Sequence, residues 1–207
     1  MSNTPDLSSI EARVSYGIGR QLGGQLRSNA IEGLDLEIVK LGLQQGFDNV
    51  EALVADAELQ EAFDALQQQR QAQADAAARE AGAAGVRYLE ENANKEGVQV
   101  TASGLQYEVL VAGDGAKPGA TATVRTHYHG TFIDGRVFDS SVNRGQPAEF
   151  PVNGVIAGWT EALQLMNVGS KWRLHVPSEL AYGSRGAPGA IPPHSTLVFE
   201  VELLDIL

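Results

Sequence analysis

Two histidines on one expected strand are the first candidates for chemistry in this chain. His127 and His129 alternate in the segment THYHG, so both side chains would face the same side of a strand, where they could share a metal ion. No Asp, Glu or third His stands near them at the spacing of a metal site. Surface or hydrogen-bonded histidines are the better interpretation, and we expect neither a metal nor a cofactor.

Other catalytic arrangements are also missing from the sequence. The chain has no cysteine, which excludes thiol catalysis, disulfides and cysteine-ligated zinc. No nucleophile stands beside a base, and no phosphate-binding loop with a lysine is present. Asp139 lies in VFDSS, where a turn or helix cap is the simplest interpretation. Chemistry that needs an acid, a base or a nucleophile is therefore not indicated.

A group of aromatic and branched residues beside glycine-rich turns is what remains. Trp159, one of only two tryptophans, stands in VNGVIAGWTEAL, where a turn leads into a short helix. Each member of the group taken singly is best explained as core, but together they are too many to lie beside turns by chance. The group consists of Tyr128, Phe138, Phe150, Val155, Ile156, Trp159, Tyr182, Ile191 and Phe199.

The elements that must position this group are short strands and one helix. Alternation is clear in KWRLHV and TLVFEVELL, where every second residue is apolar. Turn signals such as AGDGAKPG and GSRGAPG separate the strands. The sequence predicts an antiparallel sheet covered by the helix that Trp159 begins, with strands at 105–110, 123–129, 171–176 and 196–204.

The N-terminal region predicts two helices. Residues 8–29 carry an apolar residue at every fourth position, and Ser8 with Glu11 forms a capping box. A second helix follows Asp35 as its N-cap. The first helix contains glycines that destabilise a helix, so we expect a second helix to approach closely there. These glycines are Gly17, Gly19, Gly23 and Gly24.

A long helix is predicted from Asp56, another candidate cap, to about Asn94. Its apolar residues lie near its two ends, and its centre, QQQRQAQADAAARE, is polar on all sides. That pattern is typical of a helix that crosses solvent between two packed bodies, and a disordered linker is the alternative. The predicted organisation is a helical domain at 1–56, a connecting helix at 57–96 and a sheet domain at 97–207, an α+β fold.

Composition limits the partners of the chain. A formal net charge of −11 over 207 residues argues against nucleic acid or an anionic membrane as the main partner. No segment approaches the roughly 18 uninterrupted apolar residues of a spanning helix, and the first thirty residues lack the apolar run of a signal peptide. We therefore expect a cytoplasmic protein. Two small helices make little core alone, so we expect a homodimer through the N-terminal helices.

Several segments together resemble a known family. VRTHYHGTFIDGRVFDSS, GVIAGWTEALQLMNVGSKWRLHVP, AYG and IPPHSTLVFEVELLDI resemble the FK506-binding protein (FKBP) type of peptidyl-prolyl cis-trans isomerase over nearly all of 100–207. SYGIGRQLGGQL followed by a long helix is similar to the dimerisation module of the two-domain bacterial members, the 22-kDa FKBP and macrophage infectivity potentiator types. The resemblance implies a curved, roughly five-stranded antiparallel sheet wrapped on a short helix, with a hydrophobic pocket between them.

The resemblance also assigns roles to residues of the pocket. Trp159 would be its floor, and Asp139 and Arg144 its polar rim; Asp139 and the Tyr182 hydroxyl would orient the peptide. Three positions depart from the common pattern and would widen the pocket: Ala148, Ala187 and Ala190. The implied catalytic residues are Asp139, Phe138, Tyr182, Trp159 and Phe199. The implied substrate-binding residues are Tyr128, Arg144, Phe150, Val155, Ile156 and Ile191.

The implied reaction needs none of the catalytic groups that the sequence lacks. Rotation about a prolyl bond takes tens to hundreds of seconds unaided, because the planar amide carries resonance. The planar form is more dipolar than the twisted form, so an apolar pocket disfavours the ground state more than the transition state. We expect an isomerase that acts on X-Pro bonds of peptides and folding proteins, with dimer-dependent, chaperone-like binding of unfolded chains.

Two other interpretations stay open from the sequence. One is a non-catalytic chaperone or peptide-binding module that uses the same pocket and dimer. The other is a scaffold with an inactive domain, which the complete aromatic group disfavours. The resemblance further implies that macrolides such as FK506 or rapamycin bind the pocket.

Overall fold

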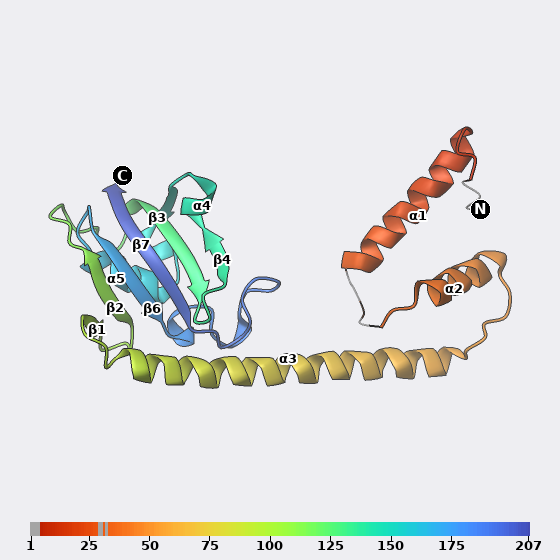
Figure 1. Cartoon of the computed structure of the whole chain (residues 1–207), viewed down its shortest axis with the longest axis horizontal. Coiled ribbons are helices and arrows are strands. Elements are labelled where there is room, and N and C mark those ends of the chain that lie inside the picture. Colours follow the sequence, from red (N-terminus) through yellow and green to blue (C-terminus); the bar gives the residue numbers. More distant parts are fainter. Residues whose placement is uncertain (1–4, 29–30, 32) are drawn as a thin grey trace. The chain divides into compact units, whose positions relative to one another are not determined.

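The computed structural model describes residues 5–28, 31 and 33–207. They fall into two compact units, one that ends at Phe63 and one that spans Asp64–Leu207. The first unit holds α1 (Ile10–Ser28), α2 (Leu36–Asp48) and the start of α3 (Asp56–Asn92) (Figure 1). Among the described residues, no helix is both long and apolar enough to cross a membrane.

Side-chain caps define where two of these helices begin. The Asp35 carboxylate accepts hydrogen bonds from the backbone N–H groups of Glu37 and Ile38, at 2.8 and 3.3 Å, as the sequence predicted. In α1 the prediction of Ser8 as cap is wrong by one residue. The cap is Ser9, whose hydroxyl accepts from the Ala12 N–H at 3.0 Å.

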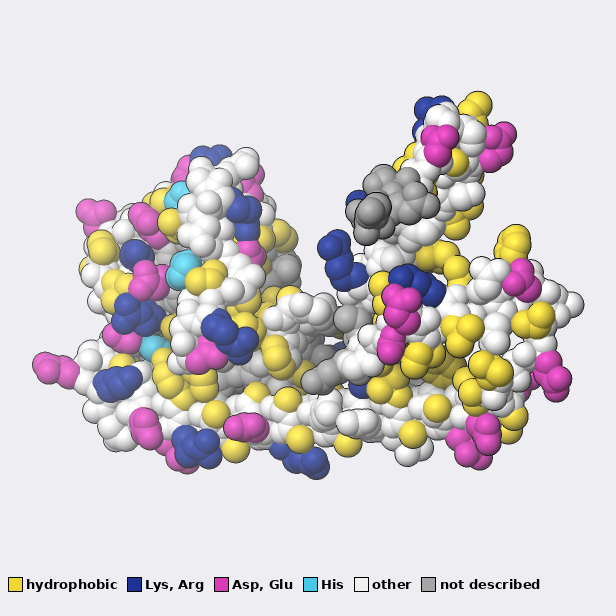
Figure 2. Space-filling model, turned by 45° about the vertical axis from the view of Figure 1, so that its right-hand side comes forward, with side chains coloured by type: hydrophobic (Ala, Val, Ile, Leu, Met, Phe, Trp, Pro, Cys, Tyr) yellow, Lys and Arg dark blue, Asp and Glu magenta, His cyan; other side chains and the backbone are white. Residues whose placement is uncertain are grey.

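The first unit leaves its apolar side chains uncovered. Neither α1 nor α2 contains a buried residue. Ile38 is 67% exposed and Phe47 is 88% exposed, although both belong to the apolar residues of α2. A Cβ added at Gly17 or Gly23 of α1 would meet no neighbouring atom within 4 Å. Among the described residues, nothing makes the close helix contact expected at these glycines, and hydrophobic side chains gather on the N-terminal helices in Figure 2.

The second unit contains an antiparallel sheet and the helix α5 (Ala157–Leu165). The sheet order is β1-β2-β6-β7-β3-β4, and β5 pairs with the same strand, β3, as β4 does. The sheet has more strands than the five or so that the resemblance implied. Three of its strands are too short for an alternation pattern to be recognised in the sequence. The strands are β1 (Val98–Val100), β2 (Gln106–Val111), β3 (Thr123–Phe132), β4 (Val137–Ser140), β5 (Ala148–Pro151), β6 (Lys171–Val176) and β7 (Leu197–Ile206).

The core lies between this sheet and α5. Every second residue of β7 points into it, which confirms the alternation seen in the sequence. Leu163 of α5 and Met166, which caps its C-terminal end, are completely buried against the sheet. Further completely buried core residues are Leu105, Val124, Val152, Leu174, Val176, Leu197, Val201 and Leu203.

The C-terminal half of α3 packs on the sheet domain through small and polar residues. The buried positions of this helix are Ala78, Gly85 and Asn92, which recur every seven residues and share one face. Val86, expected at the apolar end of the helix, is instead 57% exposed. Asn92 donates to the Gln106 side chain of β2 at 3.0 Å. The helix is therefore fixed by close approach and hydrogen bonds rather than by a large apolar stripe.

A buried histidine joins α3 to the sheet. His175 of β6 is only 2% exposed, and its Nδ1 lies 2.7 Å from the Tyr88 hydroxyl of α3. Its Nε2 lies 2.9 Å from a carboxylate oxygen of Glu108 on β2. Burial lowers the pKa of His175, and the neighbouring Glu108 carboxylate opposes that shift without cancelling it.

This histidine should make stability pH-dependent. Because the pKa of His175 is lower in the folded state, the unfolded state takes up the proton first as pH falls. The contribution is complete above about pH 6.5 and is lost progressively as pH falls toward the folded-state pKa. We expect the free energy of unfolding in urea to depend less on pH between about 7.5 and 5.5 in His175→Gln than in the wild type. His194→Gln, at an exposed histidine, is the control and should keep the wild-type slope. An unchanged slope in His175→Gln would contradict this assignment.

Candidate functional site

A cavity of about 440 Å³ opens above Trp159 in the second unit. Its walls come from four strands, the start of α5 and the loop after β6. Nine of its ten lining residues belong to the group singled out from the sequence or its expected rim; Gly154 is the tenth. The lining consists of Tyr128, Phe138, Asp139, Phe150, Gly154, Val155, Ile156, Trp159, Tyr182 and Phe199.

Trp159 is held by the edges of three aromatic rings. Its ring centroid lies 5.4 Å from Tyr128, 5.9 Å from Phe150 and 5.3 Å from Phe199, all at nearly perpendicular angles. Such edge-to-face contacts are the favoured arrangement of aromatic pairs. The indole is 4% exposed and still lines the cavity, so it is both a core residue and a floor.

The Trp159 indole also carries an unpaired polar atom. Its Nε1 is one of three buried side-chain nitrogen or oxygen atoms without a hydrogen-bond partner among the described residues. A buried unpaired donor costs about 1–3 kcal/mol, so the fold sacrifices stability at this position. Because the Nε1 atom is itself buried, the floor presents the carbon atoms of the ring to the cavity, which suits an apolar group.

Phe138 reaches the cavity because a glycine lies beneath it. A Cβ added at Gly130 of β3 would lie 2.7 Å from the Phe138 ring and 3.1 Å from the Phe199 ring. The two rings contact each other edge to face at 5.5 Å. Gly130 was not identified from the sequence, since nothing local marks a glycine that two distant aromatic rings require.

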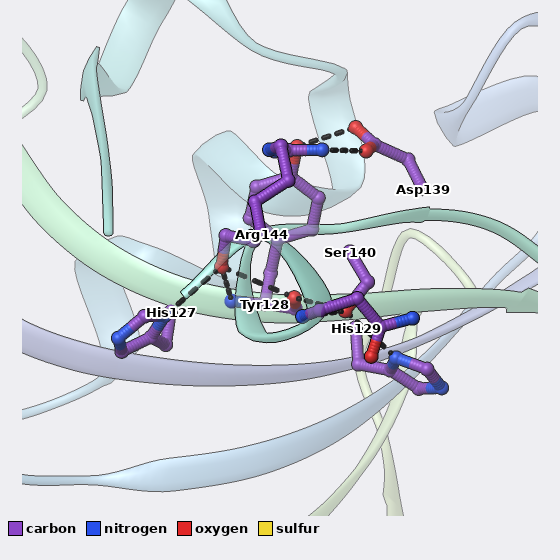
Figure 3. Close-up of polar contacts among 8 residues, drawn as sticks. His127, Tyr128, His129, Asp139, Ser140 and Arg144 are labelled. Carbon is purple, nitrogen blue, oxygen red and sulfur yellow. Dashed lines mark hydrogen bonds and ion pairs between the residues drawn. The ribbon is translucent and has the colours of Figure 1, made fainter. Parts of the chain in front are cut away.

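The rim of the cavity is a charged hydrogen-bond cluster. The Tyr128 hydroxyl donates to one oxygen of Asp139, and Arg144 donates to the other. Arg144 also donates to the Tyr128 hydroxyl at 2.9 Å. Figure 3 shows the Asp139 and Arg144 side chains pointing toward each other beside Tyr128.

Asp139 is an ionised acceptor in this cluster. Burial raises the pKa of Asp139, but hydrogen bonds from Tyr128 and Arg144 outweigh that effect, so its pKa lies below the usual value. Burial and the bond to Asp139 raise the pKa of Tyr128. Both groups therefore keep one protonation state at neutral pH, which suits a role in orientation rather than proton transfer.

A short helix presents Arg144 to the cluster. In α4 (Ser141–Arg144) the N-cap is Ser140, whose hydroxyl accepts from the Asn143 N–H at 3.1 Å. The Ser141 hydroxyl accepts from the Tyr128 N–H at 2.7 Å and ties the helix to β3. The cap suggested for Asp139 is thus provided by its neighbour, and the Asp139 carboxylate remains in the rim.

The remaining candidates lie outside the cavity lining. Ile191 is buried in the core behind the loop after β6 and exchanges two backbone hydrogen bonds with Ala187, both at 2.8 Å. His127 and His129 contact the hydroxyls of Ser141 and Ser140, at 3.1 and 3.0 Å. Neither histidine lines the cavity, and the individual roles assigned to the site residues stay predictions.

The three alanine departures also lie outside the lining. Ala148 and Ala187 pack half-buried against the core, and Ala190 is exposed. The wider pocket expected from them stays a prediction.

A second hollow, of about 510 Å³, lies along α1. Its lining residues, Tyr16, Gly19, Arg20, Gly23, Gly24 and Arg27, come from this single helix, so no second element encloses it. The cavity above Trp159 is enclosed by several elements and lined mainly by apolar rings, as small-molecule sites are. We regard the cavity above Trp159 as the functional site.

Comparison with known proteins identifies two domains. Residues 114–204 match the sequence model of the FKBP-type peptidyl-prolyl cis-trans isomerase family. Residues 11–109 match that of the domain amino terminal to FKBP-type peptidyl-prolyl isomerase.

Individual relatives match over almost the whole chain. The FKBP-type 22 kDa peptidyl-prolyl cis-trans isomerase of Escherichia coli K12 is 55% identical, over 99% of both proteins. The outer membrane protein MIP of Legionella longbeachae is 38% identical, over 99% of this chain and 89% of that protein. The crystal structure of FkpA from Escherichia coli matches 96% of this chain and 97% of that chain, with 38% identity and a TM-score of 0.70. The chain therefore belongs to the FKBP-type peptidyl-prolyl cis-trans isomerase family, with both the isomerase domain and the domain that precedes it.

Proposed function

We propose that this protein accelerates cis-trans isomerisation of X-Pro bonds in peptides and folding proteins, by binding the proline ring in the cavity above Trp159. The observation that carries the proposal is an aromatic cavity of about 440 Å³ whose floor is a tryptophan without local hydrogen bonds. This volume lies within the range of ligand pockets. The function agrees with the family to which the chain belongs.

The cavity can lower the barrier without proton transfer. The barrier to rotation, about 18–20 kcal/mol, arises from resonance that keeps the amide planar and dipolar. Water solvates the planar form well, whereas the rings of Phe138 and Phe199 carry no hydrogen-bonding group and the one polar atom of the Trp159 ring is itself buried. The twisted form has lost much of its dipole, so it gives up less solvation free energy when it enters the cavity. The free-energy difference between the two forms therefore shrinks.

The rim orients the peptide in this proposal. The Asp139 carboxylate is ionised and held from both sides, so it offers a fixed negative charge at the edge of an apolar cavity. The Tyr182 side chain lines the cavity and is 41% exposed, which leaves its hydroxyl available to a peptide carbonyl. Macrolides such as FK506 or rapamycin are proposed ligands of the same cavity.

Dimer-dependent binding of unfolded chains is the second part of the proposal. Large apolar side chains of α1 and α2 are exposed, and monomeric proteins rarely leave extended apolar patches uncovered. A second copy of the chain that packs on these helices would bury them and fill the space at the α1 glycines. Two linked cavities would then raise the effective concentration of binding sites for one unfolded chain. A cytoplasmic location stays a prediction.

A substitution at the floor tests catalysis. Trp159→Phe keeps an apolar ring without the N–H, and we expect it to retain most of the activity on a proline tetrapeptide. Trp159→Ala removes the floor, and kcat/KM should fall by at least about tenfold. The assay is the isomerisation rate, together with a circular dichroism spectrum to confirm folding. Suppression of protein aggregation is measured on the same variants. This measurement distinguishes an isomerase from the alternative, a non-catalytic chaperone. Wild-type kcat/KM in folded Trp159→Ala would contradict the proposed site.

Truncation tests the division between the two units. The truncated protein should begin at Asp64, because α3 packs on the sheet domain from Ala78 onward. We expect residues 64–207 to keep full activity on a tetrapeptide, to scatter light as a monomer, and to accelerate proline-limited protein refolding much less than the full chain. The full chain should scatter as a dimer. Equal refolding activity of the two proteins, or a monomeric full chain, would contradict this part of the proposal.

A further inference from the structure

The segment 182–196 connects the cavity to the long helix. At one end Tyr182 lines the cavity. At the other end Thr196 directly precedes β7, whose third residue, Phe199, also lines it. Any displacement of this segment therefore reaches two residues of the cavity.

Hydrogen bonds within the segment 182–196 hold it together. The His194 N–H donates to the carbonyl of Gly183 at 2.9 Å, beside Tyr182. Ala187 and Ile191 exchange two further bonds, both at 2.8 Å. His194 has a φ of +58°, in the left-handed region that is uncommon for residues other than glycine.

The two glycines of α3 lie where this segment meets the helix. A Cβ added at Gly85 would lie 2.3 Å from Thr196 Oγ1 and 3.0 Å from Thr196 Cβ. A Cβ added at Gly82 would lie 3.3 Å from His194 Cβ, a milder conflict. Glycine is disfavoured inside a helix, so its presence here is explained by the need for close approach.

We propose that Gly82 and Gly85 are positioning residues for the isomerase site. By admitting His194 and Thr196 close to its axis, α3 holds the segment 182–196 and thereby sets the position of Tyr182 against the bound peptide. The helix is then part of the peptide-binding unit rather than only a connection to the N-terminal helices. This inference rests on the isomerase function proposed above.

The size of the conflict predicts the size of the effect. Optimal carbon contacts begin near 3.5 Å, so Gly85→Ala must displace Thr196 by about 1 Å. The Thr196 side chain has little room to rotate, because the residue is only 5% exposed, whereas the contact of its Cβ at 3.0 Å is a milder conflict that a shift of a few tenths of an ångström relieves. A misplacement of about 1 Å far from the reacting bond can cost up to about 100-fold in rate.

The test uses the full chain with one substitution in α3. In Gly85→Ala we expect kcat/KM for a proline tetrapeptide to fall by about tenfold, mainly through a higher KM, since Trp159 and Phe138 are held by other elements. The indole ¹H–¹⁵N signal of Trp159 should shift, because Phe199 contacts its ring at 5.3 Å. The signal of Trp172, which stacks on Tyr107, should stay in place.

Three further variants separate positioning from general damage. Ala83→Gly alters the same helix at an exposed position and should leave kcat/KM and the Trp159 signal unchanged. Gly82→Ala should have a smaller effect than Gly85→Ala. If Gly85→Ala does not fold, Gly82→Ala tests the positioning role instead. Thr196→Ala, added to Gly85→Ala, removes the atom at 2.3 Å and should restore most of the activity.

The outcomes distinguish this inference from the proposed function. An inactive wild-type chain would contradict the isomerase function itself. An active wild type combined with wild-type KM and Trp159 signal in folded Gly85→Ala would overturn only the positioning role. An equal loss in Ala83→Gly, or no restoration by Thr196→Ala, would overturn it as well.

Discussion

The structure depends on keeping an apolar cavity open within a packed core. Protein interiors normally close such spaces, since each gap loses contacts between atoms. Here the edges of three rings fix Trp159 in place, and Gly130 lets the Phe138 and Phe199 rings approach β3 closely. The buried, unpaired indole N–H is the feature of this arrangement that lowers the stability of the fold. A cavity walled by rigid rings can exclude water and still admit a proline ring.

Charge and apolarity are separated in this site. The interior of the cavity holds aromatic and branched side chains, and the ionised Asp139 is confined to the rim by Tyr128 and Arg144. α4, capped by Ser140 and tied to β3 through Ser141, fixes that rim. The carboxylate can thus direct a peptide without solvating its planar amide in the interior. A similar separation is found in α3, which packs on the sheet domain through small residues and leaves its other faces exposed to solvent.

Sequence reasoning succeeded where the information is local and failed where it is distant. Strand patterns located β2, β6 and β7 to within two residues at each end and β3 except for its last three residues, and the carboxylate of Asp35 identified the start of α2. The resemblance brought together nine of the lining residues. Strands of three or four residues carry too little alternation to be recognised. Gly130, Gly85 and His175 were missed as structural determinants, because their importance arises from neighbours far away in the sequence.

The central claim is that the cavity lowers the rotational barrier by withholding solvation, with no proton transferred in the transition state. The most direct test is the solvent isotope effect: kcat/KM for a proline tetrapeptide measured in H₂O and in D₂O at matched pH and pD. Rotation without proton transfer predicts a ratio of about 1, whereas general acid–base catalysis predicts about 2 or more. A ratio of about 1 that persists in Trp159→Phe supports the account. A large ratio in the wild type would contradict it.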